Sequence, residues 1–272
     1  MTNSLDPVPS PVPVSQTGKW TWKHTGGLLG ITSFSVWMAI RGPFGVYTSW
    51  LVVMASMLLF TLIAGQGIKG MWRGAFIDER NRISLSRFQM LAWTIVILSG
   101  LATLIVARVG ANPADAMQVK VDSNLWFLMG ISATSLVGAP MIKSNKAAST
   151  LEKSQADVLL AAQGAELEKL KIQGQMVSHK SVHEASWSDL FTGEEVANFT
   201  FLDLGKIQMF FFTVLLVLAY GISFGAMLAA STSATTLPDA LPSVSQGMVA
   251  LLGISHGGYL INKAVPVPTA GS

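Results

Sequence analysis

The sequence SRFQM at residues 86–90 opens an apolar run, LAWTIVILSGLATLIVA, that ends at residue 107. A second pentapeptide of the same pattern, GKIQM at residues 205–209, opens FFFTVLLVLAYGISFGAML, which ends at residue 228. Each opening is followed by a polar loop and another apolar run that contains Gly-Ile-Ser, at residues 130–132 and 253–255. The sequence therefore predicts a duplicated membrane hairpin, because a copy that recurs in one orientation limits the possible topologies.

The composition indicates an integral membrane protein. Half of the residues are hydrophobic, only 12% are charged, and the mean hydropathy is +0.49, values outside the range of soluble globular proteins. We predict an all-α, polytopic helical bundle of about six transmembrane helices, since an apolar helix of about 20 residues crosses the hydrocarbon layer. Five helices are the alternative, because the first is short and a turn at 41–45 could lie in the membrane face. The predicted spans are 26–40, 45–66, 88–107, 125–142, 208–230 and 247–262.

The charges predict the orientation. With both termini in the cytoplasm, fifteen of the 18 Lys and Arg residues lie inside, and only Arg41, Arg108 and Lys120 lie outside. This bias follows the positive-inside rule and predicts a bacterial cytoplasmic (inner) membrane protein. Loop Lys and Arg also account for the pI of 9.2. We therefore expect the lipid bilayer as a partner and no nucleic acid.

The duplication divides the chain into segments. The similarity begins upstream of the spans, where Trp72 and Phe76 resemble Trp187 and Phe191. Each copy then has a cytoplasmic lead-in and two spans, and an even number of spans makes the copies parallel repeats about an axis along the membrane normal. The predicted segments are a disordered Pro-rich tail (1–25), an N-terminal hairpin (26–66), repeat 1 (67–143), a cytoplasmic helical insert (144–186), repeat 2 (187–264) and a C-terminal tail (265–272).

A few polar side chains fall inside the predicted spans. Gln89 and Gln208 occupy matching positions and predict either a paired contact across the two-fold axis, the rim of a pathway, or amides in the headgroup layer. His256 is the only histidine within a span, and it indicates either a functional polar site or a structural hydrogen bond. The candidate intramembrane positions are Gln89, Gln208, Ser132, Ser255, His256 and Tyr259.

Two residue types predict how the helices are placed. Small residues at four-residue spacing let helices approach closely, so we expect packing at Gly221, Gly225, Ala229, Gly253 and Gly257. Tryptophan rings suit the membrane interface, and we expect interfacial anchors at Trp20, Trp22, Trp37, Trp50, Trp72 and Trp126.

The insert between the copies is the candidate docking region. Residues 147–173 are rich in Ala, Leu, Glu and Lys, which predicts a helix for a partner, for self-association or for the protein's own cytoplasmic face. An exposed acidic and aromatic segment follows, which indicates either a docking site for a partner or an interfacial helix lying beside the membrane. His179 and His183 have the i, i+4 spacing of a metal pair, but no third ligand accompanies them, so no metal is expected. The docking residues predicted are Trp187, Asp189, Phe191, Glu194 and Glu195.

The sequence contains no motif that indicates an enzyme. There is no cysteine, P-loop, dinucleotide fingerprint, HExxH or GxSxG, and the spans contain no carboxylate. We therefore expect no catalytic residues and no cofactor. The predicted function is a scaffolding membrane protein that organises a membrane-associated complex through its insert. The alternative is a channel or uncoupled permease, with a pathway lined by Gln89, Gln208, Ser132, Ser255 and His256.

Overall fold

The computed structural model describes residues 18–41, 45–111, 113–149, 169–231 and 236–265. Most of the predicted N-terminal tail, most of the predicted insert helix and nearly all of the C-terminal tail lie outside these residues. The boundary of the tail at residue 25 is wrong, because Trp22 already begins the first helix. The tail ends earlier since the aromatic and apolar residues after Gly18 pack on the end of the second helix.

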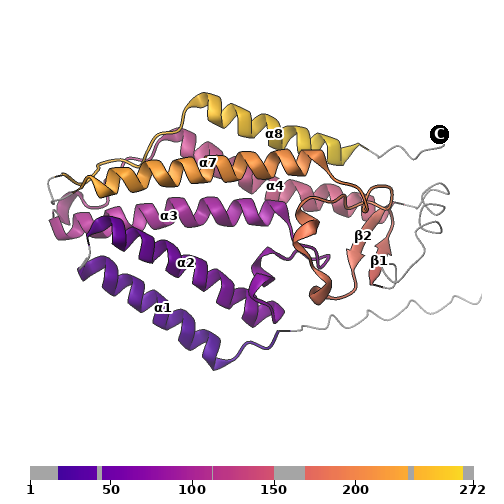
Figure 1. Cartoon of the computed structure of the whole chain (residues 1–272), viewed down its shortest axis with the longest axis horizontal. Helices are drawn as coiled ribbons and strands as arrows, with labels where there is room; N and C mark the ends of the chain where they lie inside the picture. Colours follow the sequence, from indigo (N-terminus) through magenta and orange to yellow (C-terminus); the bar gives the residue numbers. More distant parts are fainter. Residues whose placement is uncertain (1–17, 42–44, 112, 150–168, 232–235, 266–272) are drawn as a thin grey trace, which may run out of the picture.

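The described residues are mostly helical, and each predicted span is a helix (Figure 1). Four of these helices, α2, α3, α4 and α7, are long and apolar enough to cross a membrane. The α-helices are α1 (Trp22–Arg41), α2 (Val46–Lys69), α3 (Leu85–Ala111), α4 (Ser123–Ala148), α7 (Leu204–Ala229) and α8 (Gln246–Ala264).

Local sequence signals set the helix ends. The side chains of Asp122, Asp203 and Ser245 accept backbone N–H bonds at the starts of α4, α7 and α8. These are N-caps, which satisfy donors that have no partner within the helix. At the other end of α2, Gly70 has φ 72° and its N–H donates to Gln66 O. Glycine adopts this left-handed conformation without a Cβ clash, so it terminates the helix.

The helices form a bundle with a flanking pair. α3 packs on α4 and α7, and α8 packs on α4 and α7, so these four surround one apolar core (Figure 1). α1 and α2 pack on each other and lie along α3. The most buried core side chains are Trp93, Leu104, Leu125, Leu128, Phe224, Leu228 and Leu252.

Trp50 is part of this core, which corrects its predicted interfacial position. Its side chain is buried, its Nε1–H donates to Ser99 Oγ at 3.0 Å, and its ring meets Phe224 edge-on at 5.2 Å. α2 packs against both α3 and α7, so a residue near its start faces protein rather than lipid. The other five tryptophans predicted as anchors are exposed, with fractions between 47% and 79%.

Only part of the predicted small-residue packing occurs. A Cβ on Gly225 would lie 3.1 Å from Tyr47 Cε2 and 3.2 Å from Trp50 Cζ3, so this glycine lets α7 approach α2 closely. A Cβ on Gly253 would meet Ile131 Cδ1 at 3.6 Å. Around Gly221 and Gly257 no described atom lies within 4 Å of such a Cβ, and Ala229 is exposed. One residue of each ladder, Gly225 on α7 and Gly253 on α8, therefore lies at a helix contact.

One end of the bundle is covered by a polar cap, which we define as residues 71–84 and 169–203. Residues 170–173 form a strand and not the end of the predicted helix, so the fold contains one antiparallel hairpin. Alternating burial along Leu170–Gln173 suits a strand, and Gly174, at φ 54°, begins the two-residue turn. The cap elements are the 3₁₀ helices η1 (Trp72–Phe76), η3 (Val182–Glu184) and η4 (Trp187–Leu190) and the strands β1 (Leu170–Gln173) and β2 (Met176–His179).

Both lead-ins fold in the same order within the cap. η1 begins at Trp72, a β-bridge joins Ile77 to Ile83, and α3 begins at Leu85. η4 begins at Trp187, a β-bridge joins Thr192 to Leu202, and α7 begins at Leu204. Strand β2 joins the two lead-ins, because His179 N–H donates to Arg80 O and Val177 N–H donates to Glu194 O. The cap is thus one folded unit.

Both ends of the described chain lie at the cap end of the bundle. Trp20 packs on Gly67 near the end of α2, and Lys263 near the end of α8 forms an ion pair inside the cap. At the opposite end, the loops that precede α4 and α8 pair through Lys120 and Asp239, whose side chains lie 2.6 Å apart. This arrangement agrees with an even number of helices between the termini.

Candidate functional site

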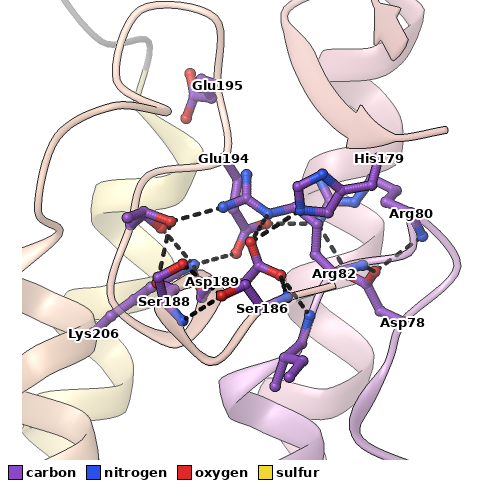
Figure 2. A network of polar contacts seen from close by, with 12 residues as sticks. Asp78, Arg80, Arg82, His179, Ser186, Ser188, Asp189, Glu194, Glu195 and Lys206 are labelled. Atoms are coloured by element: carbon purple, nitrogen blue, oxygen red, sulfur yellow. Dashed lines mark hydrogen bonds and ion pairs between the residues drawn. The ribbon is translucent and has the colours of Figure 1, made fainter. Parts of the chain in front are cut away.

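The most distinctive group of residues is a buried cage around Glu194. The Glu194 side chain is 7% exposed, and cations from four separate parts of the fold surround it. Figure 2 shows two of these cations, Arg80 and Lys206, beside Glu194. The ion pairs join its carboxylate oxygens to Arg80 Nη2 at 2.5 Å, Lys143 Nζ at 2.5 Å, Lys206 Nζ at 2.7 Å and Lys263 Nζ at 2.9 Å. Arg80 precedes α3, Lys143 lies near the end of α4, Lys206 near the start of α7 and Lys263 near the end of α8. One carboxylate therefore ties the ends of the bundle helices to the cap.

Asp189 holds a second buried cluster next to this cage (Figure 2). Its carboxylate lies 3.3 Å from Arg82 Nε and 3.1 Å from His179 Nε2. It also accepts the backbone N–H groups of Ile83 at 3.2 Å and Ser186 at 2.9 Å. Asp189 thus joins the lead-in of the first copy, strand β2 and the lead-in of the second copy.

Lys206 connects the two clusters. Its side chain is 2% exposed, and its ammonium donates to Asp189 O at 3.0 Å and Thr192 O at 2.8 Å as well as pairing with Glu194. An ammonium has three donors, so every donor of Lys206 has a partner. Lys146, close to the end of α4, pairs in the same way with Glu195 at 2.8 Å.

The charges of the cage determine the protonation of its carboxylates. Burial alone raises the pKa of Glu194, but the charges of Lys143, Lys206, Lys263 and Arg80 together hold it well below its usual range. For Asp189, burial again raises the pKa. The hydrogen bond from His179 and the charge of Arg82 together lower this pKa by more than burial raises it, so the net shift is downward. Both carboxylates are therefore ionised in the folded protein at neutral pH.

Acid should destabilise the protein through this cage. A carboxyl whose pKa is lower in the folded state stabilises that state above its unfolded pKa of about 4.3, and the contribution is lost as the pH falls toward the folded value. We expect a nearly constant unfolding temperature between about pH 6 and about pH 5 and a fall below about pH 4.3. Tryptophan fluorescence during heating in detergent measures this, and Glu194→Gln should flatten the fall. An equal slope in Glu194→Gln would show that the cage does not set the acid sensitivity.

The cage corrects the predicted docking segment. Asp189, Glu194 and Glu195 are 4%, 7% and 6% exposed, so the prediction that this acidic segment is exposed is wrong. Their burial is offset by cationic partners, since Arg82 lies beside Asp189, Lys146 pairs with Glu195, and the four cations of the cage surround Glu194. Trp187 is 51% exposed, whereas Phe191 is half-buried and its ring meets Phe210 at 5.1 Å. A sequence signal for the cage existed, since Lys143, Lys206 and Lys263 each lie at the edge of an apolar run.

The two matching glutamines lie in different environments. Gln89 is fully buried, and its Nε2 donates to Thr213 Oγ1 at 2.8 Å, which joins α3 to α7. Gln208 is exposed on α7, so the predicted contact between the two amides is wrong. The positions differ because Lys206 turns inward to reach Glu194, and Gln208, two residues later, then faces outward.

The other intramembrane candidates lie at the contact between α4 and α8. His256 is buried, and its Nδ1 lies 2.5 Å from Ser135 Oγ. Ser132, Ser255 and Tyr259 are also buried. Several polar atoms inside the bundle have no hydrogen-bond partner among the described residues. These atoms are Gln89 Oε1, Trp93 Nε1, Ser132 Oγ, Tyr220 Oη, Ser255 Oγ and His256 Nε2.

Within the described residues no three His, Asp or Glu side chains are placed to hold a metal ion. His179 ends strand β2 and pairs with Asp189, whereas His183 lies exposed in η3. The two histidines are therefore not neighbours on a helix.

Comparison of this chain with protein-family models, with curated proteins and with solved structures found no match.

Proposed function

We propose that this protein is a membrane scaffold that holds a membrane-associated complex through its polar cap and insert. The observation that carries the proposal is the cage around Glu194, which links the cap to α4, α7 and α8 through buried ion pairs. A partner bound to the cap is then fixed relative to the helix bundle. A buried ion-pair network resists relative movement of the parts it joins, because a charge that leaves its partners stays buried without compensation.

We also propose the topology on which this role depends. Six membrane-crossing helices with both termini in the cytoplasm place the cap and its Lys and Arg residues on the cytoplasmic side. Trp20 and Lys263, near the two ends of the described chain, lie at the same end of the bundle. This supports placing both termini on the same side of the membrane. The shared order of 3₁₀ helix, β-bridge and long helix in the two lead-ins supports a parallel duplication.

The proposed docking surface is the aromatic edge of the cap together with the insert. Trp72 and Trp187 begin the two matching 3₁₀ helices and are 57% and 51% exposed. Phe76 lies beside Trp187, with ring centroids 5.8 Å apart. Exposed aromatic side chains at a rigid surface are frequent anchors of protein interfaces.

The scaffold role is tested by co-purification in mild detergent from cells that express the full chain or variants of it. A deletion of residues 150–168 removes insert sequence and leaves the cage residues in place. Trp187→Ala removes one exposed aromatic, and Trp126→Ala, exposed on α4 away from the cap, is the matched control. We expect the deletion or Trp187→Ala to release the same partner proteins and Trp126→Ala to retain them. Equal recovery in all variants would contradict the proposal.

A channel or uncoupled permease is the second candidate, and the polar atoms without partners inside the bundle favour it. Water or a solute could satisfy Ser132, Ser255 and His256 there. The cage opposes it, since Lys143, Lys206 and Lys263 converge on Glu194 at the cap end of the bundle. Flux into liposomes that is lost in His256→Ala would support a channel, and the absence of flux in the parent protein would exclude one.

A further inference from the structure

A cavity of about 400 Å³ lies where α3 and α4 meet the cap. Its volume is within the range of small-molecule sites. The walls come from the end of η1 and the loop after it, the first turns of α3 and the last turns of α4. The cage side chain Lys143 forms part of one wall, so the cavity adjoins the ion-pair cluster.

The lining changes from charged to apolar along the helices. Residues toward the cap carry both signs of charge, namely Asp78, Glu79, Arg87 and Lys143, and Glu79 forms an ion pair with Arg87. Residues toward the middle of the bundle are apolar, namely Met90, Leu91, Leu136 and Pro140. The change coincides with the start of the apolar run at residue 88 and the end of the run at residue 142. In a bilayer this level is the boundary between headgroups and acyl chains.

Polar groups at the cavity have capacity for a ligand. Ser86 is 3% exposed, lines the cavity, and its hydroxyl has no hydrogen-bond partner among the described residues. Arg87 forms one ion pair, with Glu79, which leaves other guanidinium donors for a second acceptor. The first turn of α3 starts at Leu85, so its N–H groups add partial positive charge at the same wall.

We propose that this cavity binds the phosphoethanolamine headgroup of a membrane phospholipid. Arg87, the Ser86 hydroxyl and Lys143 would hold the phosphate, because each donates hydrogen bonds. Glu79 would accept a hydrogen bond from the primary ammonium. Asp78, whose oxygens already accept hydrogen bonds from Arg80 and from the backbone N–H of Arg82, would contribute its negative charge. The acyl chains would then lie against Met90, Leu91 and Leu136. A headgroup with only a negative charge would lie beside the carboxylates of Glu79 and Asp78 without a cation to pair with them. The zwitterionic phosphoethanolamine headgroup therefore fits this lining better.

This inference rests on the membrane location and goes beyond the scaffold role. Failure of the lipid experiment would therefore leave the co-purification result unaffected. A soluble compound with the same phosphate and ammonium groups has the same chemistry as the lipid headgroup. The experiment distinguishes binding of the phospholipid from binding of such a compound.

The test is native mass spectrometry of the full-length protein in detergent. Phosphatidylethanolamine, phosphatidylglycerol and phosphatidylcholine are added separately, and soluble phosphoethanolamine is added as a competitor. We expect phosphatidylethanolamine to bind about tenfold more tightly than the other two lipids. The ammonium of phosphatidylcholine has no N–H to donate, and the headgroup of phosphatidylglycerol has no cation. Equal binding of the three lipids would overturn the proposal. Displacement by soluble phosphoethanolamine at similar concentrations would overturn the assignment to a phospholipid.

Variants separate the two halves of the headgroup. Arg87→Gln should weaken phosphatidylethanolamine by about tenfold or more, since one charged donor to the phosphate is lost. Arg108→Gln, at the opposite end of α3, is the matched control and should bind as the parent does. Glu79→Gln should weaken the binding of phosphatidylethanolamine, whose ammonium it would contact. The binding of phosphatidylglycerol, which has no ammonium, should not change.

A further variant tests the cavity without changing charge. Leu136→Trp should fill the cavity and abolish binding while the unfolding temperature stays close to that of the parent. Unchanged binding in both Arg87→Gln and Leu136→Trp would show that the lipid binds elsewhere. Both variants should fold, because the side chain of Arg87 is 32% exposed and Leu136 is only half-buried.

Discussion

Glu194→Gln should lower the unfolding temperature of the protein more than any other single change to a polar side chain in the cap. The substitution keeps the size of the side chain but removes the charge that four buried cations share. Breaking a buried ion pair costs about 3–5 kcal/mol, because the remaining charge stays buried without compensation. Here three ammonium groups and one guanidinium also repel one another once the carboxylate is neutral. On the scale of soluble domains this corresponds to a fall of roughly 6–15 °C.

The measurement is the unfolding temperature in detergent, followed by tryptophan fluorescence and by size-exclusion chromatography after heating. Glu79→Gln is the matched control, since the Glu79 side chain is 72% exposed and its ion pair with Arg87 should contribute at most about 1 kcal/mol. A double variant, Glu194→Gln with Lys143→Met, should recover part of the loss because it removes one of the uncompensated cations. Equal unfolding temperatures for Glu194→Gln and the parent would refute the role of the cage.

Lys206→Met should cause the second largest fall in unfolding temperature, and a larger fall than Lys143→Met. Both lysines pair with Glu194 and both are buried. Lys206 also donates to the carbonyls of Asp189 and Thr192, which lose this donor in the variant. A buried polar group left without a partner costs about 1–3 kcal/mol, so we expect Lys206→Met to cost about 2–5 kcal/mol.

Lys143→Met is the comparison that isolates these carbonyl bonds. The single ion pair found for Lys143 within the described residues is the one with Glu194, and three other cations remain beside that carboxylate in the variant. Its loss also relieves repulsion between cations, so we expect a cost of about 1 kcal/mol or less. Unfolding temperatures in detergent give the ranking. If Lys143→Met were the more damaging variant, the carbonyl bonds of Lys206 would not carry its contribution.

The matching segments of the duplication show why local similarity did not predict the site. Arg87 and Lys206 occupy equivalent positions, as do Gln89 and Gln208. In the first copy the glutamine is buried and the arginine is partly exposed, whereas in the second copy the lysine is buried and the glutamine is exposed. The rotation of a helix about its axis depends on its neighbours, and α7 is turned so that Lys206 reaches Glu194. The same pentapeptide pattern thus contributes to the wall of the cavity in one copy and to the buried cage in the other.

The sequence by itself determined where the six α-helices lie. Hydrophobic runs act over a few residues of chain, so the helices could be predicted from short windows. Their exact ends and the N-caps at Asp122, Asp203 and Ser245 became evident only in the structure. The strand at 170–173 escaped prediction because its composition suits a helix, and its pairing with β2 at residues 176–179 outweighed that preference.

Only the tertiary structure decided which charges and polar groups lie together. Arg80 and Glu194 are 114 residues apart in the chain, and Gln89 and Thr213 are 124 residues apart. Glu194 and Glu195 have the local sequence of a solvated acidic turn, and they are buried because the ends of three helices bring Lys143, Lys206 and Lys263 to the same place. A charge leaves water only when partners are in position, and the position of partners that are distant in the sequence is a property of the packed fold.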